Sequence, residues 1–144
     1  MPLLQGLLTG MYKTAEELPA VHARFRQFRG DRERAGHGEE GAEEEMFAAV
    51  DGIRKVAEAE GVPMSRLAIA WTIAKPGITC ELVGTRNVSE LEENLRVASL
   101  SLSPEPMAKL DELTTPLLQK LGAKCGILPS ATHPLIQPKL LDSP

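Results

Sequence analysis

The sequence predicts an α/β protein that is mostly helical and has one or two short strands. Two observations lead to this expectation. Apolar residues recur at helical spacing in several segments, and capping residues, prolines or glycines bound these segments. A short apolar run at 78–83 lies between Gly77 and Gly84, which is typical of a strand. Since one strand cannot form a sheet, this run should stay unpaired or pair with a second copy of the chain.

The first third of the chain predicts little regular structure. Residues 1–12 are expected to form a turn and a loop, and 14–17 a short helical turn. The segment 19–41 is rich in Arg, Gly, His and acidic residues without sustained periodicity, which predicts a long loop. Loops of this length are usually functional or disordered, and the residues leave both alternatives open.

Two helices are expected next. The first spans 42–60, and Gly61 closes it. Pro63 opens the second, which ends at Pro76 and whose Trp71 should pack into the core. The expected buried residues recur at helical spacing in both: Met46, Val50, Ile53 and Ala57 in the first, and Leu67, Ala70, Trp71 and Ala74 in the second.

Two more helices follow the expected strand. One spans 89–98, and the last begins at Ser103 and Pro104. Beyond residue 122 several prolines predict an irregular tail over 123–144. The expected apolar faces are Leu91, Leu95 and Ala98 in the first of these helices, and Met107, Leu110, Leu113 and Leu117 in the second.

The composition excludes several classes of function. A net charge of -4, with 42% hydrophobic and 25% charged residues, indicates neither nucleic-acid nor membrane partners. There is no apolar span or secretory pattern, so a cytoplasmic location is expected. Cys80 and Cys125 lack metal-ligand spacing, which predicts reduced structural thiols and no metal site.

The most informative motif is GTRNVSELEEN at 84–94, which joins the apolar run to the start of a helix. Gly84 leaves room for a ligand, while the helix start offers unpaired N–H groups and the positive end of its dipole. Arg86 adds a fixed cation, so the motif favours an anion site. The alternative is a capping box formed by Ser89 and Glu92, because a capped helix needs no ligand.

Separated motifs in the same order resemble the C-terminal part of aldo-keto reductases, especially bacterial-type, potassium-channel-β-like members that take NADP. They run up to about residue 122: PLLQGLLTGMY at 2–12, GEEGAEEE at 38–45, LAIAW at 67–71, KPG at 75–77, 78–94 and LSPE at 102–105. The resemblance implies that 1–122 is the C-terminal fragment of a (β/α)8 TIM barrel. Such a barrel takes roughly 250 residues, so 144 residues cannot form a whole one.

The resemblance also implies NADP as cofactor, with contacts from two parts of the chain. In the first part, Pro2, Leu3 and Gly6 would follow the nicotinamide ribose and the pyrophosphate. Arg26 lies in an RFRQF stretch similar to one that contacts phosphate or adenine. The alternative for Arg26 is a solvated basic loop.

In the second part, Gly84 would leave room for the cofactor at the start of the site. Arg86 would face the 2′-phosphate that distinguishes NADP from NAD, since a guanidinium matches phosphate oxygens. Glu90 stands where relatives often carry glutamine. Glu93 and Asn94 would contact the adenine edge, and their alternative is an ordinary polar helix face.

In the family that this chain resembles, the catalytic Asp, Tyr, Lys and His lie in the first half of the barrel. No residue of this chain corresponds to them by the resemblance. Tyr12, the only tyrosine, does not fit, nor do the histidines. The chain alone should therefore be inactive, and a carbonyl substrate would require the rest of the barrel. The alternative is a truncated, non-catalytic nucleotide-binding or regulatory fragment. Open barrel edges also predict possible self-association.

Two departures from the family weaken the expected site. Met11 replaces a lysine that would contact the cofactor phosphates. Glu81 places an acid in a strand that a barrel would bury, which is costly for an unpaired charge. We expect Glu81 either to pair with Arg86 or to lie on an exposed strand.

Overall fold

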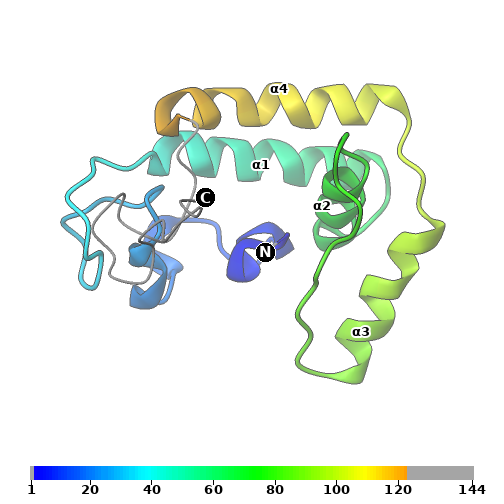
Figure 1. Ribbon diagram of the computed structural model, residues 1–144, viewed down its shortest axis with the longest axis horizontal. Coiled ribbons are helices and arrows are strands. Elements are labelled where there is room, and N and C mark those ends of the chain that lie inside the picture. Colours follow the sequence, from blue (N-terminus) through cyan, green and yellow to red (C-terminus); the bar gives the residue numbers. More distant parts are fainter. Residues whose placement is uncertain (1, 123–144) are drawn as a thin grey trace, which may run out of the picture.

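The computed structural model describes residues 2–122 and is built from helices (Figure 1). Short 3-10 helices form the first part, and α-helices with one further 3-10 helix form the rest of the described residues. In chain order they are η1 (Leu4–Thr9), η2 (Ala15–Glu17), η3 (Ala20–Arg24), α1 (Glu43–Ala59), α2 (Met64–Ile73), α3 (Val88–Leu95), η4 (Arg96–Ser99) and α4 (Pro104–Leu121).

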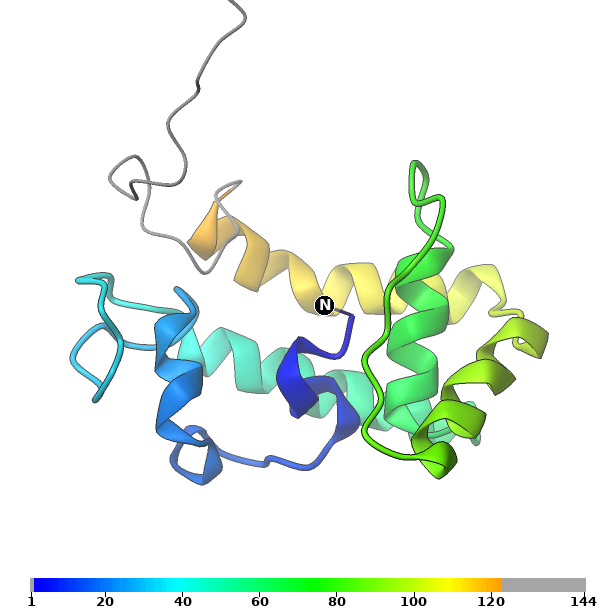
Figure 2. The same ribbon diagram turned by 60° about the horizontal axis from the view of Figure 1, so that its bottom comes forward.

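Helices α1 and α4 form the long axis of the molecule. They run side by side in opposite directions in both views, and an ion pair between Lys120 Nζ and Glu45 Oε1 (2.8 Å) joins the end of α4 to the start of α1 (Figures 1 and 2). Helix α2 crosses one end of this pair, and α3 lies beyond it.

The predicted periodicity of α1 is confirmed. Three glutamates in its first turn suit the positive end of the helix dipole. Its apolar stripe faces α4 and the first part of the chain, with Met46, Val50, Ile53 and Ala57 all buried. In α4 Leu110 is fully buried, and Met107, Leu113 and Leu117 are half-buried, as the spacing predicted.

Helix α2 begins after Pro63 and is the most deeply buried helix, since Leu67 and its neighbours 68–70 are nearly inaccessible. Trp71 packs only partly against the core. Its indole N–H donates to Asp111 Oδ1 on α4 (2.7 Å), and the Lys75 ammonium lies 5.0 Å from the centre of its ring. Trp71 therefore links α2 to α4 as well as filling the core.

Two apolar clusters hold these helices together. The larger gathers residues from η1, the loop before α1, and α1, α2 and α4: Leu7, Phe25, Phe28, Met46, Val50, Ile53, Ala57, Met64, Leu67 and Leu110. The smaller joins Ile69 and Ala70 of α2 to Val97 of η4, and Leu3 and Val83 pack against it.

The predicted strand at 78–83 is wrong, because no residue among 2–122 is in a strand. A strand needs a neighbour to pair its N–H and C=O groups, and the described residues supply none at this segment. Ile78 and Leu82 are exposed here, and so is Cys80, which is a free thiol rather than a core residue. Cys125 and the predicted irregular tail, 123–144, lie outside the described residues.

The segment 19–41, for which loop and disorder both stood open, is a folded loop. The short turn predicted at 14–17 is confirmed as η2, and η3 follows it. Backbone hydrogen bonds close the loop, from the Gly30 N–H to the Glu39 carbonyl (2.8 Å) and from the Ala42 N–H to the Gln27 carbonyl (2.8 Å).

The helix predicted over 89–98 is divided into α3 and η4. Its expected apolar face is not packed, since α3 has no buried residue and Ala98 is exposed. Among 2–122, no helix has both the length and the apolar character needed to cross a membrane.

Candidate cofactor site

The start of α3 is organised by Asn87, not by Ser89. The Asn87 side-chain oxygen accepts a hydrogen bond from the Glu90 N–H (2.9 Å), and the Glu90 carboxylate accepts one from the Arg86 N–H (2.8 Å). This reciprocal arrangement is close to a capping box two residues earlier than predicted. The Ser89 and Glu92 box was wrong because the extended residue that precedes the helix is Asn87.

Arg86 projects from this helix start into solvent. Its side chain is 79% exposed, and its Nη2 lies 2.8 Å from Glu90 Oε1. The Arg86 guanidinium lowers the pKa of Glu90, and Glu90 in turn raises the pKa of Arg86. Arg86 is therefore a fixed cation at an open surface, with an acidic neighbour that competes for it.

Both expectations for Glu81 are wrong, because Arg86 pairs with Glu90 instead and Glu81 does not lie on an exposed strand. The residue is half-buried, and its Oε2 is buried without a hydrogen-bond partner. Burial raises the pKa of Glu81.

Glu93 connects α3 to α2. Its Oε2 lies 2.6 Å from Arg66 Nη2, and its Oε1 lies 2.7 Å from Arg96 Nη1. The hydrogen bond from Arg66 is the main reason why the pKa of Glu93 is lowered. Asn94 is half-buried beside it. Glu93 is thus held in place by two arginines and keeps its charge.

The N-terminal turn has an unusual backbone. Leu4, Gln5 and Gly6 have φ values of 45°, 54° and 94°, in the left-handed region that favours glycine. The Leu3 carbonyl closes the turn by accepting the N–H groups of Gly6 (3.0 Å) and Leu8 (3.2 Å). A Cβ at Gly6 would meet only Tyr12 Cε2, at 3.7 Å. The backbone angle therefore requires a glycine at this position, whereas the space around it does not.

The structure brings most of the predicted residues to one side. Leu3 and Val83 pack against the same small cluster, and both views show η1 beside the extended segment that leads to α3 (Figures 1 and 2). The start of the chain, with Leu3 before η1, therefore lies beside the segment that leads into the 84–94 motif.

Arg26 lies elsewhere. Its guanidinium pairs with Glu39, with Nη2 2.6 Å from Oε2, and approaches the Leu121 carbonyl at the end of α4 (3.5 Å). The C-terminal end of α4 and helix α3 lie on opposite sides of the molecule (Figure 1). The contact predicted for Arg26 thus requires a ligand that reaches across the molecule.

Sequence reasoning missed the residues that support this side. Arg66 holds Glu93, and Arg54 on α1 donates from Nη1 to the Gly10 carbonyl (3.1 Å), fixing the end of η1. Both partners are distant in sequence, so no local pattern marked them. Asn87 was detectable, because Asn followed three residues later by Glu is a cap signature.

The cap occupies the N–H groups of Glu90 and Arg86, so the helix start itself needs no ligand, and what could accommodate a nucleotide phosphate is the exposed Arg86 guanidinium beside the open glycine. A Cβ at Gly84 would meet no atom within 4 Å. Among 2–122, no three His, Cys, Asp or Glu side chains gather in a way that could hold a metal ion.

The sequence model of the aldo/keto reductase family matches residues 1–115, and the chain belongs to this family. It is 31% identical over 121 residues to a putative voltage-gated potassium channel subunit beta of Schizosaccharomyces pombe, covering 81% of this chain and 33% of that protein. The family resemblance found in the sequence is thereby confirmed.

Two further relatives are reductases. The L-glyceraldehyde 3-phosphate reductase of Escherichia coli O157:H7 is 29% identical over 112 residues, covering 77% of this chain and 31% of the enzyme. Aldo-keto reductase yakc of Schizosaccharomyces pombe, whose name includes NADP(+), is 29% identical over 111 residues, covering 77% and 30%. The chain spans about a third of the length of these relatives.

Proposed function

We propose that this chain is the nucleotide-binding C-terminal part of an NADP-dependent aldo-keto reductase. In this proposal α3 and the segment before it bind the 2′-phosphate and adenine end of the cofactor. The observation that carries the proposal is the exposed Arg86 guanidinium at the capped start of α3, next to the open position of Gly84. Membership of the family and a relative named for NADP(+) support the same cofactor.

Each residue of the proposed site has a separate task. Arg86 would bind the 2′-phosphate through two parallel N–H groups, and Glu93 and Asn94 would contact the adenine edge. The turn at Pro2, Leu3 and Gly6 would present backbone groups to the ribose and pyrophosphate. Arg66 and Arg96 keep Glu93 in one orientation.

Two residues oppose tight binding. Glu90 occupies Arg86 and adds a negative charge beside the proposed phosphate position. Met11, which is exposed, supplies no ammonium where a lysine is expected. We therefore propose weaker cofactor binding than a lysine and a glutamine at these positions would give.

NADP supplies the hydride chemistry of this family when it is bound. We propose that the described residues do not supply the Asp, Tyr, Lys and His quartet and that reduction of an aldehyde or ketone needs the rest of the barrel. Tyr12 instead stacks edge-on against His22, with ring centres 5.8 Å apart. A non-catalytic, regulatory nucleotide-binding protein is the second candidate, and it would use the same site.

The proposal is tested by titrating the purified chain with NADPH and NADH and following nicotinamide fluorescence. Arg86→Gln should weaken NADPH binding by about tenfold, because a charge-assisted pair with phosphate is lost, and should leave NADH binding nearly unchanged. Glu90→Gln should tighten NADPH binding by roughly two- to fivefold, because Arg86 is released and a repulsive charge is removed.

Arg34→Gln is the matched control. Arg34 is an exposed arginine that lies 3.7 Å from Glu33 in the loop before α1, so its loss should not change NADPH binding. Equal effects of Arg86→Gln and Arg34→Gln would contradict the proposed site. Oxidation of NADPH by this chain alone with an added aldehyde would contradict the proposal that catalysis needs the rest of the barrel.

A further inference from the structure

The segment that connects α2 to α3 leaves its backbone polar groups unpaired. Among the described residues, none forms a hydrogen bond with an N–H or carbonyl group of 79–85. The segment runs extended beside α2, as both views show (Figures 1 and 2). An extended chain with unpaired N–H and carbonyl groups is the edge of a strand that lacks its neighbour, and such an edge can pair with another chain.

The side chains of this segment also alternate as they do in a strand. Glu81 and Val83 are half-buried, and Val83 packs on the smaller apolar cluster. Cys80 is exposed, and so is Leu82, which at 88% is the most exposed of the large apolar side chains in 2–122. One face of the segment thus lies on the molecule, and the other presents apolar groups to solvent.

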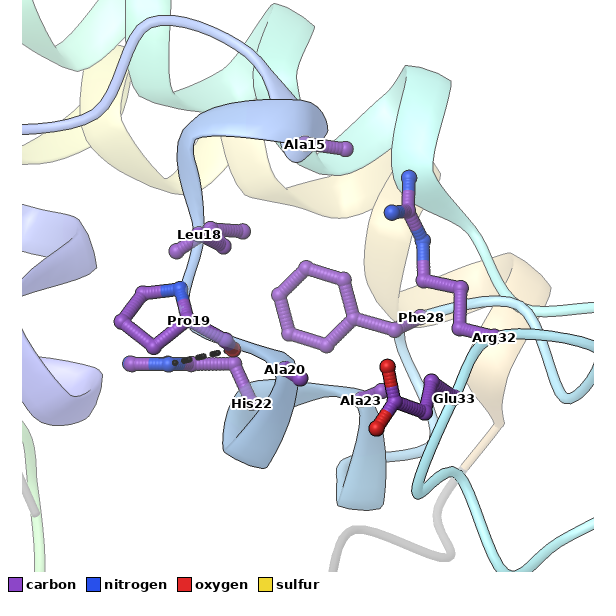
Figure 3. Close-up of a pocket in the computed structure, with 9 residues that line it drawn as sticks. All are labelled: Ala15, Leu18, Pro19, Ala20, His22, Ala23, Phe28, Arg32 and Glu33. Atoms are coloured by element: carbon purple, nitrogen blue, oxygen red, sulfur yellow. Dashed lines mark hydrogen bonds between the residues drawn. The ribbon is translucent and has the colours of Figure 1, made fainter.

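The hollow beside His22, of about 280 Å³, differs from this segment because its polar groups are satisfied within the chain (Figure 3). Both ring nitrogens of His22 face backbone carbonyls. Arg32 Nε lies 2.5 Å from Glu43 Oε1, and Glu33 lies 3.7 Å from Arg34. The hollow therefore requires no further partner, whereas the backbone of 79–85 does.

A second copy of the segment fits the first in one antiparallel register. Opposite residues of an antiparallel pair share a face, so residues of the apolar outer face must oppose one another. A two-fold axis at Glu81 would place two carboxylates directly opposite each other, which is destabilising. An axis at Thr79 would place Leu82 opposite Pro76, which has no N–H to donate. An axis at Cys80 avoids both problems.

The register centred on Cys80 also gives each side chain a suitable neighbour. Ile78 stands opposite Leu82 of the second copy, so the two exposed apolar side chains cover each other. Thr79 stands opposite Glu81, whose Oε2 has no hydrogen-bond partner within the single chain. A threonine hydroxyl is a donor, and a carboxylate oxygen is an acceptor.

The Ile78 N–H decides which pairs are hydrogen-bonded, because it already donates to the Lys75 carbonyl (3.1 Å). Pairs alternate along an antiparallel ladder, so Ile78 and Cys80 belong to one set, and Thr79 and Glu81 to the other. The ladder must therefore use the free N–H groups of Thr79 and Glu81. Cys80 then forms a non-hydrogen-bonded pair with its copy, with Cα atoms about 4.5 Å apart, which is within the range of a disulfide.

We propose that two copies of this chain associate through residues 77–83, which pair as antiparallel strands about a two-fold axis at Cys80. The proposal does not depend on cofactor binding. Each copy supplies the neighbour that the other copy's segment lacks, and the same residues serve on both sides. A ribbon of two short strands is only marginally stable in water, so the dimer should be weak and its population should rise with protein concentration.

Oxidation with diamide, which accepts the two thiol hydrogens, tests the register in a chain that carries Cys125→Ser. Cys80 should form a disulfide-linked dimer whose yield rises with protein concentration up to about 1 mM. The matched control carries Cys80→Ser, Cys125→Ser and Ser101→Cys, because Ser101 is exposed and lies outside the segment. Its yield should be about tenfold lower, since no register brings its thiols together. Equal yields from the two proteins overturn the proposal.

Amide hydrogen exchange of the wild-type chain gives a second readout that needs no variant. The N–H groups of Thr79, Glu81 and Val83 should exchange about fivefold more slowly in concentrated than in dilute protein, because they enter the ladder. The N–H groups of Cys80 and Leu82 should not change. Protection of Cys80 and Leu82 instead, or protection of neither set, overturns the proposal.

Sedimentation equilibrium tests the association itself. Cys80→Lys places two ammonium groups opposite each other and should abolish the dimer, whereas Ser101→Lys should keep it. Urea denaturation of dilute protein, followed by Trp71 fluorescence, checks that both variants fold. A wild-type chain that stays monomeric overturns the proposal, including one that binds only a separate polypeptide carrying the rest of the barrel.

Discussion

Replacing Gly41 with alanine should be among the most damaging single-methyl changes in the loop before α1. The glycine has a φ of 80°, and a Cβ there would lie 2.6 Å from the backbone carbonyl carbon and oxygen of Phe28. Leaving the favoured backbone region costs roughly 1–2 kcal/mol. Forcing a buried backbone segment to move costs roughly 1–3 kcal/mol. Together these effects should lower the free energy of unfolding by about 2–5 kcal/mol, a large part of the stability of a small domain.

Two other glycines of the same loop distinguish the cost of the backbone angle from the cost of the steric clash. Gly36 has a φ of 65° and open space around its Cβ position, so Gly36→Ala should cost about 1–2 kcal/mol for the backbone alone. Gly38 has neither a positive φ nor a neighbour within 4 Å, so Gly38→Ala should be neutral or stabilising by up to about 1 kcal/mol. Urea denaturation followed by the fluorescence of Trp71 measures all three. Equal midpoints for the three variants would refute the folded loop.

Other consequences concern charge, association and packing. Hydrogen bonding from Arg32 lowers the pKa of Glu43, so their pair stabilises the fold above the carboxylate's unfolded pKa, and this contribution is lost on acidification. Glu43→Gln should therefore make the denaturation midpoint less dependent on pH between about pH 5 and pH 3. Leu82 and Leu95 are 88% and 64% exposed, so we expect concentration-dependent association in sedimentation equilibrium, and the double change to lysine should reduce it. Leu110→Ala should lower the free energy of unfolding by about 2–5 kcal/mol, measured by urea denaturation, whereas an exposed leucine such as Leu118 should tolerate the same change.

The helices were predictable because their information is local. Met46, Val50, Ile53 and Ala57 recur at the helical period, and Pro63 and Ser103 mark helix starts, so both periodicity and boundaries can be read from neighbouring residues. The run at 78–83 has the apolar pattern of a strand, yet a strand also needs a partner that the local sequence cannot supply.

In the candidate site, too, local signals could be read from the sequence, whereas contacts between distant residues could not. Gly84 and Arg86 were readable from one motif, and Asn87 carried a cap signal that the Ser89 pattern obscured. The partners of Glu93 and His22 were not readable. Arg66 is 27 residues from Glu93, and the Gln5 carbonyl is 17 residues from His22, so only the folded chain reveals these contacts.

The proposed function requires that the start of α3 recognises the 2′-phosphate of NADP. Titration of the nitrogen-15-labelled chain with 2′,5′-ADP tests it most directly, with 5′-AMP as the matched ligand that lacks the 2′-phosphate. We expect saturable shifts of the backbone amides of 84–90 with 2′,5′-ADP and much smaller shifts with 5′-AMP. Equal responses to both ligands, or shifts confined to other parts of the chain, would contradict it.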